Sequence, residues 1–298
     1  MTTRITLSAG DYRMDLLPRI GGAIGSFGWR HPRHNWIELM RPTPSGDAEP
    51  GVGDTASFPL VPFSNRIRDG KFTFRGRTVQ FPPSPIGKHY LHGTAWLQPW
   101  RVMTHAPDKV TLTQSHEPGV WPWAFDTSQE FSLNQNGLTL RMSTVNRSLE
   151  PMPFGFGLHP YFPLTPKCQL KANVTGWWEG DEEVMPVKQT GVRPDIDPRQ
   201  GLTVASVVCD NAFTGWDGKA AITWPEHQTR LTIGAPSLMD KLFFYVPPNA
   251  TFFCFEPITH FADAFNMAAA GRTDTGMIVL EPRQEVSAEV TFRAHATG

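Results

Sequence analysis

The chain has little cysteine and almost no net charge. Its three cysteines, Cys168, Cys209 and Cys254, lie far apart and form no CxxC pair, which argues against a disulfide framework and favours reduced thiols. The formal net charge is -1, from 27 basic and 28 acidic side chains. Because no overall basic excess attracts polyanions, we expect neither nucleic acid nor a membrane surface as a partner.

Long hydrophobic runs are also lacking. No segment approaches the roughly 18 apolar residues that a transmembrane helix needs. The first residues, Met1 to Ser8, contain no apolar stretch typical of a secretory signal. These two absences predict a cytoplasmic protein.

Convincing helical periodicity is scarce, because 28 prolines and 26 glycines are spread along the chain. Short strand-like segments recur instead, separated by turn residues. The Asn136-Gly137 pair between two apolar segments is the strongest of these hairpin signals. Four hairpins are expected: 71–74 with 78–81, 125–133 with 138–145, 220–224 with 229–233, and 277–280 with 285–292.

So many short strands at close spacing favour an all-β sandwich or barrel-like architecture. The polar, proline-rich segments 42–53 and 181–200 are interpreted as surface loops, because neither has the composition shift of a domain linker. We therefore expect residues 1–298 to form a single large β domain.

Five short segments place polar residues within this aromatic, proline-rich sequence. Two histidines, a carboxylate and an arginine would make a proton-transfer site if the fold gathers them, because histidine titrates near neutral pH and a carboxylate can be tuned toward it. The segments are Asn65-Arg66-Ile67, Leu91-His92-Gly93, Leu158-His159-Pro160, Asp210-Asn211 and Phe255-Glu256-Pro257.

Each of these residues also has an ordinary interpretation: Arg66 as a surface arginine, His92 as a loop histidine, Asp210 as a turn former. Glu256 follows an apolar run, so partial burial would raise its pKa and make it a better base. Two histidines and a carboxylate can also hold zinc, but no HxH or HExxH spacing supports a metal. Trp216 could supply an apolar wall to a sugar pocket.

In this order, the five segments resemble the aldose 1-epimerase (galactose mutarotase) family. The resemblance covers roughly residues 10 to 290 and implies a large antiparallel β-sandwich, the galactose mutarotase-like supersandwich. It implies that Glu256 is the general base and His159 the general acid, and that His92 helps to hold the reactive oxygen. Arg66, with Asn65, would contact the sugar near its ring oxygen, and Asp210 would accept hydrogen bonds from sugar hydroxyls.

The activity implied is interconversion of the α and β anomers of an aldohexose, in carbohydrate metabolism, by acid/base ring opening and closure. No cofactor and no metal are required. The expected partner is a small-molecule aldose, and the protein is expected to be a monomer or a homodimer. Arg283 and Thr94 stand where the family commonly has glycine, which leaves the substrate open.

Three alternatives remain. A hexose-phosphate mutarotase of the same superfamily would need extra cations near the pocket, for which Lys88 and Arg101 are candidates. A non-catalytic sugar-binding protein of the same fold would be expected to have lost the acid or the base. A glycoside hydrolase would need two carboxylates across the bond, a pair that Asp210 and Glu256 could imitate.

Overall fold

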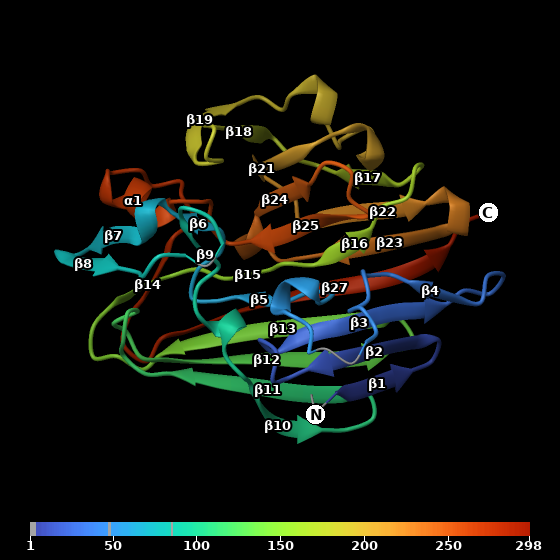
Figure 1. Ribbon diagram of the computed structural model, residues 1–298, viewed down its shortest axis with the longest axis horizontal. Helices are drawn as coiled ribbons and strands as arrows, with labels where there is room; N and C mark the ends of the chain where they lie inside the picture. Colours follow the sequence, from blue (N-terminus) through green and yellow to red (C-terminus); the bar gives the residue numbers. More distant parts are fainter. Residues whose placement is uncertain (1–3, 47–48, 85) are drawn as a thin grey trace.

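The structure is a computed structural model that describes residues 4–46, 49–84 and 86–298. Within these ranges it consists of strands and short 3-10 helices with one short α-helix, which confirms the all-β prediction. Figure 1 shows the long strands of one large sheet lying beside a second sheet that ends at the top of the view. No helix of the described residues is long and apolar enough to cross a membrane.

The larger sheet has nine antiparallel strands, and its long strands alternate between buried and more exposed residues. Phe131 and Leu133, for example, are buried in the core, while Ser132 between them is more exposed, as a half-buried strand requires. In spatial order the strands are β10 (Arg101–His105), β11 (Lys109–His116), β12 (Phe125–Asn134), β13 (Gly137–Asn146), β27 (Glu285–Ala296), β23 (Thr229–Gly234), β22 (Lys219–Trp224), β17 (Gln169–Ala172) and β20 (Leu202–Thr203).

The second large sheet has eight strands, and its central strands are buried on both faces. The apolar run before Glu256 forms the longest of them, because a strand covered on both sides needs no alternation. Its strands, in spatial order, are β19 (Pro186–Thr190), β18 (Gly176–Gly180), β21 (Cys209–Thr214), β24 (Lys241–Val246), β25 (Phe252–Ile258), β15 (Gly157–Leu158) and β5 (Pro59–Leu60), and β16 (Tyr161–Pro163) also pairs with β25.

Smaller elements complete the fold. A four-stranded sheet lies against the nine-stranded one (Figure 1), and contains β1 (Ile5–Ala9), β2 (Tyr12–Leu17), β3 (Ala23–Arg30) and β4 (Trp36–Glu38). The two-stranded pairs are β14 (Met152–Phe154) with β26 (Ile278–Leu280), β6 (Arg66–Ile67) with β9 (Tyr90–Leu91), and β7 (Lys71–Phe74) with β8 (Arg77–Gln80). The helices are η1 (Val52–Asp54), η2 (Arg68–Gly70), η3 (Ala95–Leu97), η4 (Pro194–Ile196), η5 (Val204–Ser206), η6 (Pro225–His227), η7 (Ser237–Met239) and α1 (Ala264–Ala269).

Aromatic side chains fill the space between the elements. Trp121, Trp123 and Phe72 are fully buried and pack on Phe265 of α1 or on one another. Burying a side chain of this size contributes about 1.5–3 kcal/mol each before conformational entropy is counted. Most of the tryptophans are therefore structural, as expected for a core of this composition.

Three of the four expected hairpins are confirmed: β7–β8, β12–β13 and β22–β23 pair as the sequence indicates. The fourth is wrong. The segments 278–280 and 285–296 are both strands, but β26 pairs with β14, and β27 is inserted between β13 and β23. The reason is that β27 matches β13 over eight residue pairs, which a short hairpin with β26 cannot offer.

The two expected loops differ. Segment 42–53 carries no strand in its described residues, with positions 47 and 48 outside them. Segment 181–200 is not a plain loop, because it contains β19 and η4 and extends the eight-stranded sheet by a strand.

Candidate active site

Glu256 and His159 meet because of strand register. Gly157 pairs with Ile258, and Tyr161 pairs with Cys254, so the residue between them, His159, falls opposite Glu256. The His159 Nε2 and Glu256 Oε1 atoms are 3.4 Å apart, and both side chains are almost completely buried. Strand pairing within one sheet thus places His159 and Glu256 next to each other, although almost a hundred positions separate them in the sequence.

The same register extends over the neighbouring strands. Phe243 of β24 lies opposite Glu256, and Asp210 of β21 lies opposite Tyr245 of β24. On the other side, the His159 amide donates to the Phe58 carbonyl oxygen. Side chains of alternate residues on these strands therefore converge on one face.

His159 is enclosed by aromatic rings. Phe58 and Tyr161 each stack on the imidazole with ring centroids 4.7 Å away. The Arg41 guanidinium lies 3.9 Å from the centre of the Tyr161 ring. This stack fixes the orientation of the imidazole, which is what a proton-transfer group requires.

Arg66 and His92 belong to a different element of the fold, the two-stranded β6–β9 pair, with His92 directly after β9. Arg66 pairs with Leu91, and the His92 amide donates to the Asn65 carbonyl oxygen. Asn65 and His92 both adopt positive φ values, 55° and 64°, which turns their side chains away from the strand direction. At Gly93 a Cβ atom would lie 2.1 Å from the Val61 carbonyl oxygen, so the Leu-His-Gly motif needs glycine there.

Arg66 connects this pair to the large sheet. Its Nη2 atom donates to Asp210 Oδ2 at 3.1 Å, and Nη1 lies 3.5 Å from Asn65 Oδ1. Because both Arg66 and Asp210 are partly buried, the ion pair is less screened than a surface pair. The positive charge of Arg66 is therefore already balanced by Asp210 in the protein without a ligand.

These groups surround a cavity of about 200 Å³. Its wall combines the polar groups with the apolar faces of Phe58, Trp96 and Phe243. The described residues that line it are Gly53, Phe58, Asn65, Arg66, Ile86, Leu91, His92, Trp96, His159, Tyr161, Asp210, Phe243, Tyr245 and Glu256. An apolar pocket with a few convergent polar groups is the usual form of a small-molecule site.

Burial makes both members of the central pair favour their neutral forms. It raises the pKa of Glu256 well above its ordinary value, an effect that the nearby Asp210 reinforces and Arg66 opposes. It lowers the pKa of His159 to about 3, with Arg41 acting in the same direction. The pair therefore holds one proton, shared between the two groups, over a wide range of pH.

The pKa values of His92 and Asp210 are shifted as well. Burial lowers the pKa of His92 well below its ordinary value, and His159 and Arg66 add to the shift. Burial also raises the pKa of Asp210, although its ion pair with Arg66 opposes this. A neutral His92 can donate through one ring nitrogen and accept through the other.

Several polar atoms in this cavity have no partner. Glu256 Oε2, His159 Nδ1 and His92 Nδ1 are buried and make no hydrogen bond to any residue that the structure describes. A buried polar atom without a partner costs about 1–3 kcal/mol, so three in one cavity indicate a place where a polar ligand completes the bonding.

The structure brings together six of the seven residues singled out from the sequence: Asn65, Arg66, His92, His159, Asp210 and Glu256 all line the cavity. The seventh, Trp216, does not. It is buried in the core, where its indole packs edge-on against Phe255 and its N–H donates to the Lys219 carbonyl oxygen.

Aromatic wall residues were missed instead. Tyr161, Tyr245 and Phe243 line the cavity, and alternation along the strand that contains each of them is the signal that could have found them. Tyr161 is two residues after His159, so it shares its face.

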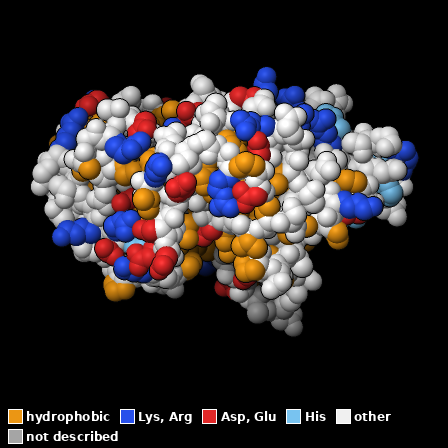
Figure 2. Space-filling view, turned by 90° about the horizontal axis from the view of Figure 1, so that it is seen from above, with side chains coloured by type: hydrophobic (Ala, Val, Ile, Leu, Met, Phe, Trp, Pro, Cys, Tyr) orange, Lys and Arg blue, Asp and Glu red, His pale blue; other side chains and the backbone are white. Residues whose placement is uncertain are grey.

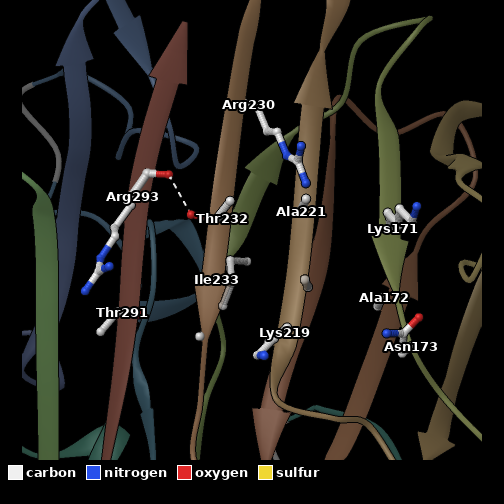
Figure 3. Close-up of a pocket in the computed structure, with 12 residues that line it drawn as sticks. Lys171, Ala172, Asn173, Lys219, Ala221, Arg230, Thr232, Ile233, Thr291 and Arg293 are labelled. Atoms are coloured by element: carbon white, nitrogen blue, oxygen red, sulfur yellow. Dashed lines mark hydrogen bonds between the residues drawn. The ribbon is translucent and has the colours of Figure 1, made fainter. Parts of the chain in front are cut away.

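A second hollow, of about 420 Å³, lies on the outer face of the nine-stranded sheet. Figure 3 shows its basic side chains on neighbouring strands: Lys171 on β17, Lys219 on β22, Arg230 on β23 and Arg293 on β27. We call this the outer groove. All four cations are exposed, and no histidine or carboxylate is among the residues of the described chain that line it. It therefore lacks groups that could transfer protons at neutral pH.

Comparison with known proteins agrees with this geometry. The family model described as "Aldose 1-epimerase" matches residues 3–293. The uncharacterized protein YphB of Escherichia coli K12 is 32% identical over 300 residues, which cover 98% of each chain.

Two solved structures share the fold. A crystal structure of an Escherichia coli K12 protein is 31% identical, superposes with a TM-score of 0.88, and covers 99% of both chains. A galactose mutarotase-like protein from Clostridium acetobutylicum is 21% identical with a TM-score of 0.86, covering 99% of this chain and 95% of its own.

Proposed function

The chain belongs to the aldose 1-epimerase family, and from this premise we propose that it interconverts the α and β anomers of an unphosphorylated aldohexose. The observation that carries the proposal is the Glu256–His159 pair, two buried proton-transfer groups 3.4 Å apart in a cavity with unpartnered polar atoms. Both groups are within reach of one small sugar ring.

Ring opening requires a proton to leave the C1 hydroxyl and a proton to reach the ring oxygen. We assign the first transfer to Glu256 and the second to His159. The reacting state is the tautomer in which the shared proton sits on His159, leaving Glu256 as a carboxylate that Arg66 stabilises. After rotation about the C1–C2 bond, the same two groups act in reverse and close the ring on the other face.

The remaining polar groups, Arg66, His92 and Asp210, would interact with the oxygen atoms of the sugar. Arg66 and His92 face the cavity from the β6–β9 pair and would stabilise negative charge as the C1–O5 bond opens. Asp210 is fixed by Arg66 and would accept hydrogen bonds from two neighbouring hydroxyls. Phe58, Trp96 and Phe243 would cover the apolar faces of the ring and exclude water.

The preference for an unphosphorylated sugar comes from charge and size. Among the described residues that line the cavity, Arg66 is the one arginine or lysine, and it is already paired with Asp210. Lys88 is exposed and paired with Glu183 and Asp69, and Arg101 lies on β10 at the edge of the other sheet. The cavity of about 200 Å³ also falls below the ~300–1,000 Å³ of pockets that hold drug-sized ligands.

Glycoside hydrolysis is less well supported. A hydrolase needs a carboxylate acid and a second carboxylate acting as base or nucleophile. Asp210 is instead engaged by Arg66, and the neighbour of Glu256 is an imidazole. A non-catalytic binding protein is equally disfavoured, because both proton-transfer groups are present.

Polarimetry on freshly dissolved α-D-glucose and α-D-galactose tests the proposal. The wild-type protein is expected to accelerate mutarotation, and His159→Asn to lose about 10²–10⁴-fold of the acceleration while keeping the fold. His295→Asn, an exposed histidine outside the cavity, is the matched control. Near-normal mutarotation by His159→Asn would refute the assignment.

The same preparation separates the alternatives. Acceleration restricted to glucose 6-phosphate or another phosphorylated sugar would replace the unphosphorylated substrate, and release of reducing sugar from a glycoside would indicate a hydrolase. Sugar binding without any acceleration would identify a non-catalytic binding protein.

A further inference from the structure

Cys254 lies directly behind the proton-transfer pair. It precedes Glu256 by two residues on β25, so both side chains point to the same face of the strand. One ligand atom each from His159, Cys254 and Glu256 all lie within 4.8 Å of one another, and all three residues are buried. We propose that these three side chains form a binding site for a thiophilic divalent cation such as Zn²⁺, which inhibits the protein by occupying its proton-transfer groups.

The donor set suits zinc. Thiolate, imidazole and carboxylate are its usual protein ligands, at about 2.0–2.3 Å, which puts tetrahedral ligand atoms roughly 3.5 Å apart. The His159–Glu256 separation of 3.4 Å already meets this value. The widest separation in the set is at most 4.8 Å, so it would have to shorten by about 1 Å for one ion to bind all three side chains.

Charge balance also favours a divalent ion. Binding would displace two protons, one from the Cys254 thiol and one from the pair formed by Glu256 and His159. The resulting thiolate and carboxylate carry two negative charges and the neutral imidazole none, so the bound ion would make the cluster neutral. Neutrality matters because an uncompensated charge in a site this buried carries a large desolvation penalty. In addition, Glu256 Oε2 is buried without a hydrogen-bond partner, so the carboxylate has an oxygen free for coordination.

The position of the cluster explains why the ion would inhibit. His159 and Glu256 line the cavity, so an ion on them faces the space that a sugar would occupy. A bound cation withdraws the lone pair of His159 and the charge of Glu256, leaving no group to accept or donate a proton. The fourth position would be open to water, which makes the site accessible from the cavity.

Two measurements test this site. Zn²⁺ is titrated into the mutarotation assay, a measurement that depends on the proposed function. Co²⁺ is titrated separately and followed by its near-ultraviolet thiolate charge-transfer absorption, which needs no turnover. Cys254→Ala is compared with Cys168→Ala, a second buried cysteine outside the cluster, and each variant is referred to its own metal-free rate.

We expect the wild type and Cys168→Ala to develop the Co²⁺ band at one ion per chain and to be inhibited reversibly by Zn²⁺. Cys254→Ala should lack the band and need at least tenfold more Zn²⁺ for half-inhibition. Absence of the band in the wild type, or equal Zn²⁺ inhibition of Cys254→Ala, would overturn the metal site. If no sugar is epimerised, the proposed function fails, and the band still decides the metal site.

Discussion

The cavity at Glu256 and the outer groove are opposite kinds of hollow. The outer groove is the larger, about 420 Å³ against about 200 Å³. Its cations are exposed and well separated on neighbouring strands (Figure 3), where water solvates each charge. In the cavity, Glu256 and His159 are instead buried and lie 3.4 Å apart, and each has one further polar atom with no hydrogen-bond partner among the described residues. The larger hollow is therefore not the one that gathers buried ionisable groups with shifted pKa values, which are typical of functional sites.

The surface elsewhere resembles the outer groove more than the cavity. Figure 2 shows basic and acidic side chains interspersed over the face that it presents. Exposed ion pairs on the protein surface, such as Arg272 with Asp274, contribute about 0–1 kcal/mol each. Substitutions of ionisable residues in the cavity should therefore change activity far more than substitutions of exposed charged residues.

The largest effect is expected for Glu256→Gln. The amide keeps the shape of the side chain but cannot take the C1 hydroxyl proton, so kcat should fall about 10²–10⁴-fold. Glu281→Gln is the matched control, because Glu281 also precedes a proline but is exposed, and its activity should stay near that of the wild type. Polarimetry measures both, and circular dichroism checks the fold. Equal rates for the two variants would contradict the proposed role of Glu256 as the base.

The pH dependence of kcat/KM should show how far burial in the cavity shifts the pKa values of His159 and Glu256. The pair is active while it holds one proton, so kcat/KM should form a plateau. Below the pKa of His159, about 3, the pair gains a second proton and kcat/KM falls. Above the raised pKa of Glu256 the pair loses its only proton, and kcat/KM falls again. Rates measured from pH 3 to 9 with a correction for spontaneous mutarotation test this; a limb near the ordinary histidine value of about 6.5 would contradict it.

Asp210→Asn should have an intermediate effect. The substitution removes the acceptor for sugar hydroxyls and frees Arg66 from its ion pair. We expect the loss mainly in KM, about 10–100-fold, as for one charged hydrogen bond of about 1.5–3 kcal/mol. Asp217→Asn, an exposed aspartate near the outer groove, is the control. A loss confined to kcat would instead assign Asp210 to the chemistry.

The sequence was sufficient to indicate the polar residues that we propose act in the cavity, and insufficient to indicate most of the aromatic wall around them. His159 and Glu256 could be predicted because each stands in a short motif beside proline, where an ordinary surface residue is unexpected. Their separation could not, because it depends on the pairing of β25 with β15 and β16, almost a hundred residues apart. Register of this kind is set by the whole sheet.

Trp216 shows the same limit. It follows Asp210 closely in sequence, which suggested a common site. In the structure, Gly215 with its positive φ ends β21 just before Trp216, and the indole enters the core instead. Tyr161 and Phe243, neither of which was singled out from the sequence as a wall residue, line the cavity because strand alternation places them there. Proximity in sequence was a weaker guide than strand period.

The smallest effect is expected in the outer groove. Lys219→Glu with Arg230→Glu reverses two exposed charges on adjacent strands without touching the core. Because neither residue lines the cavity, kcat and KM should change less than twofold at about 0.15 M salt, where the Debye length is about 8 Å. The same double variant assayed at low salt measures any long-range influence on the cavity. A larger change at both salt concentrations would show that the two hollows are coupled through the sheets, since screening would not remove a mechanical effect.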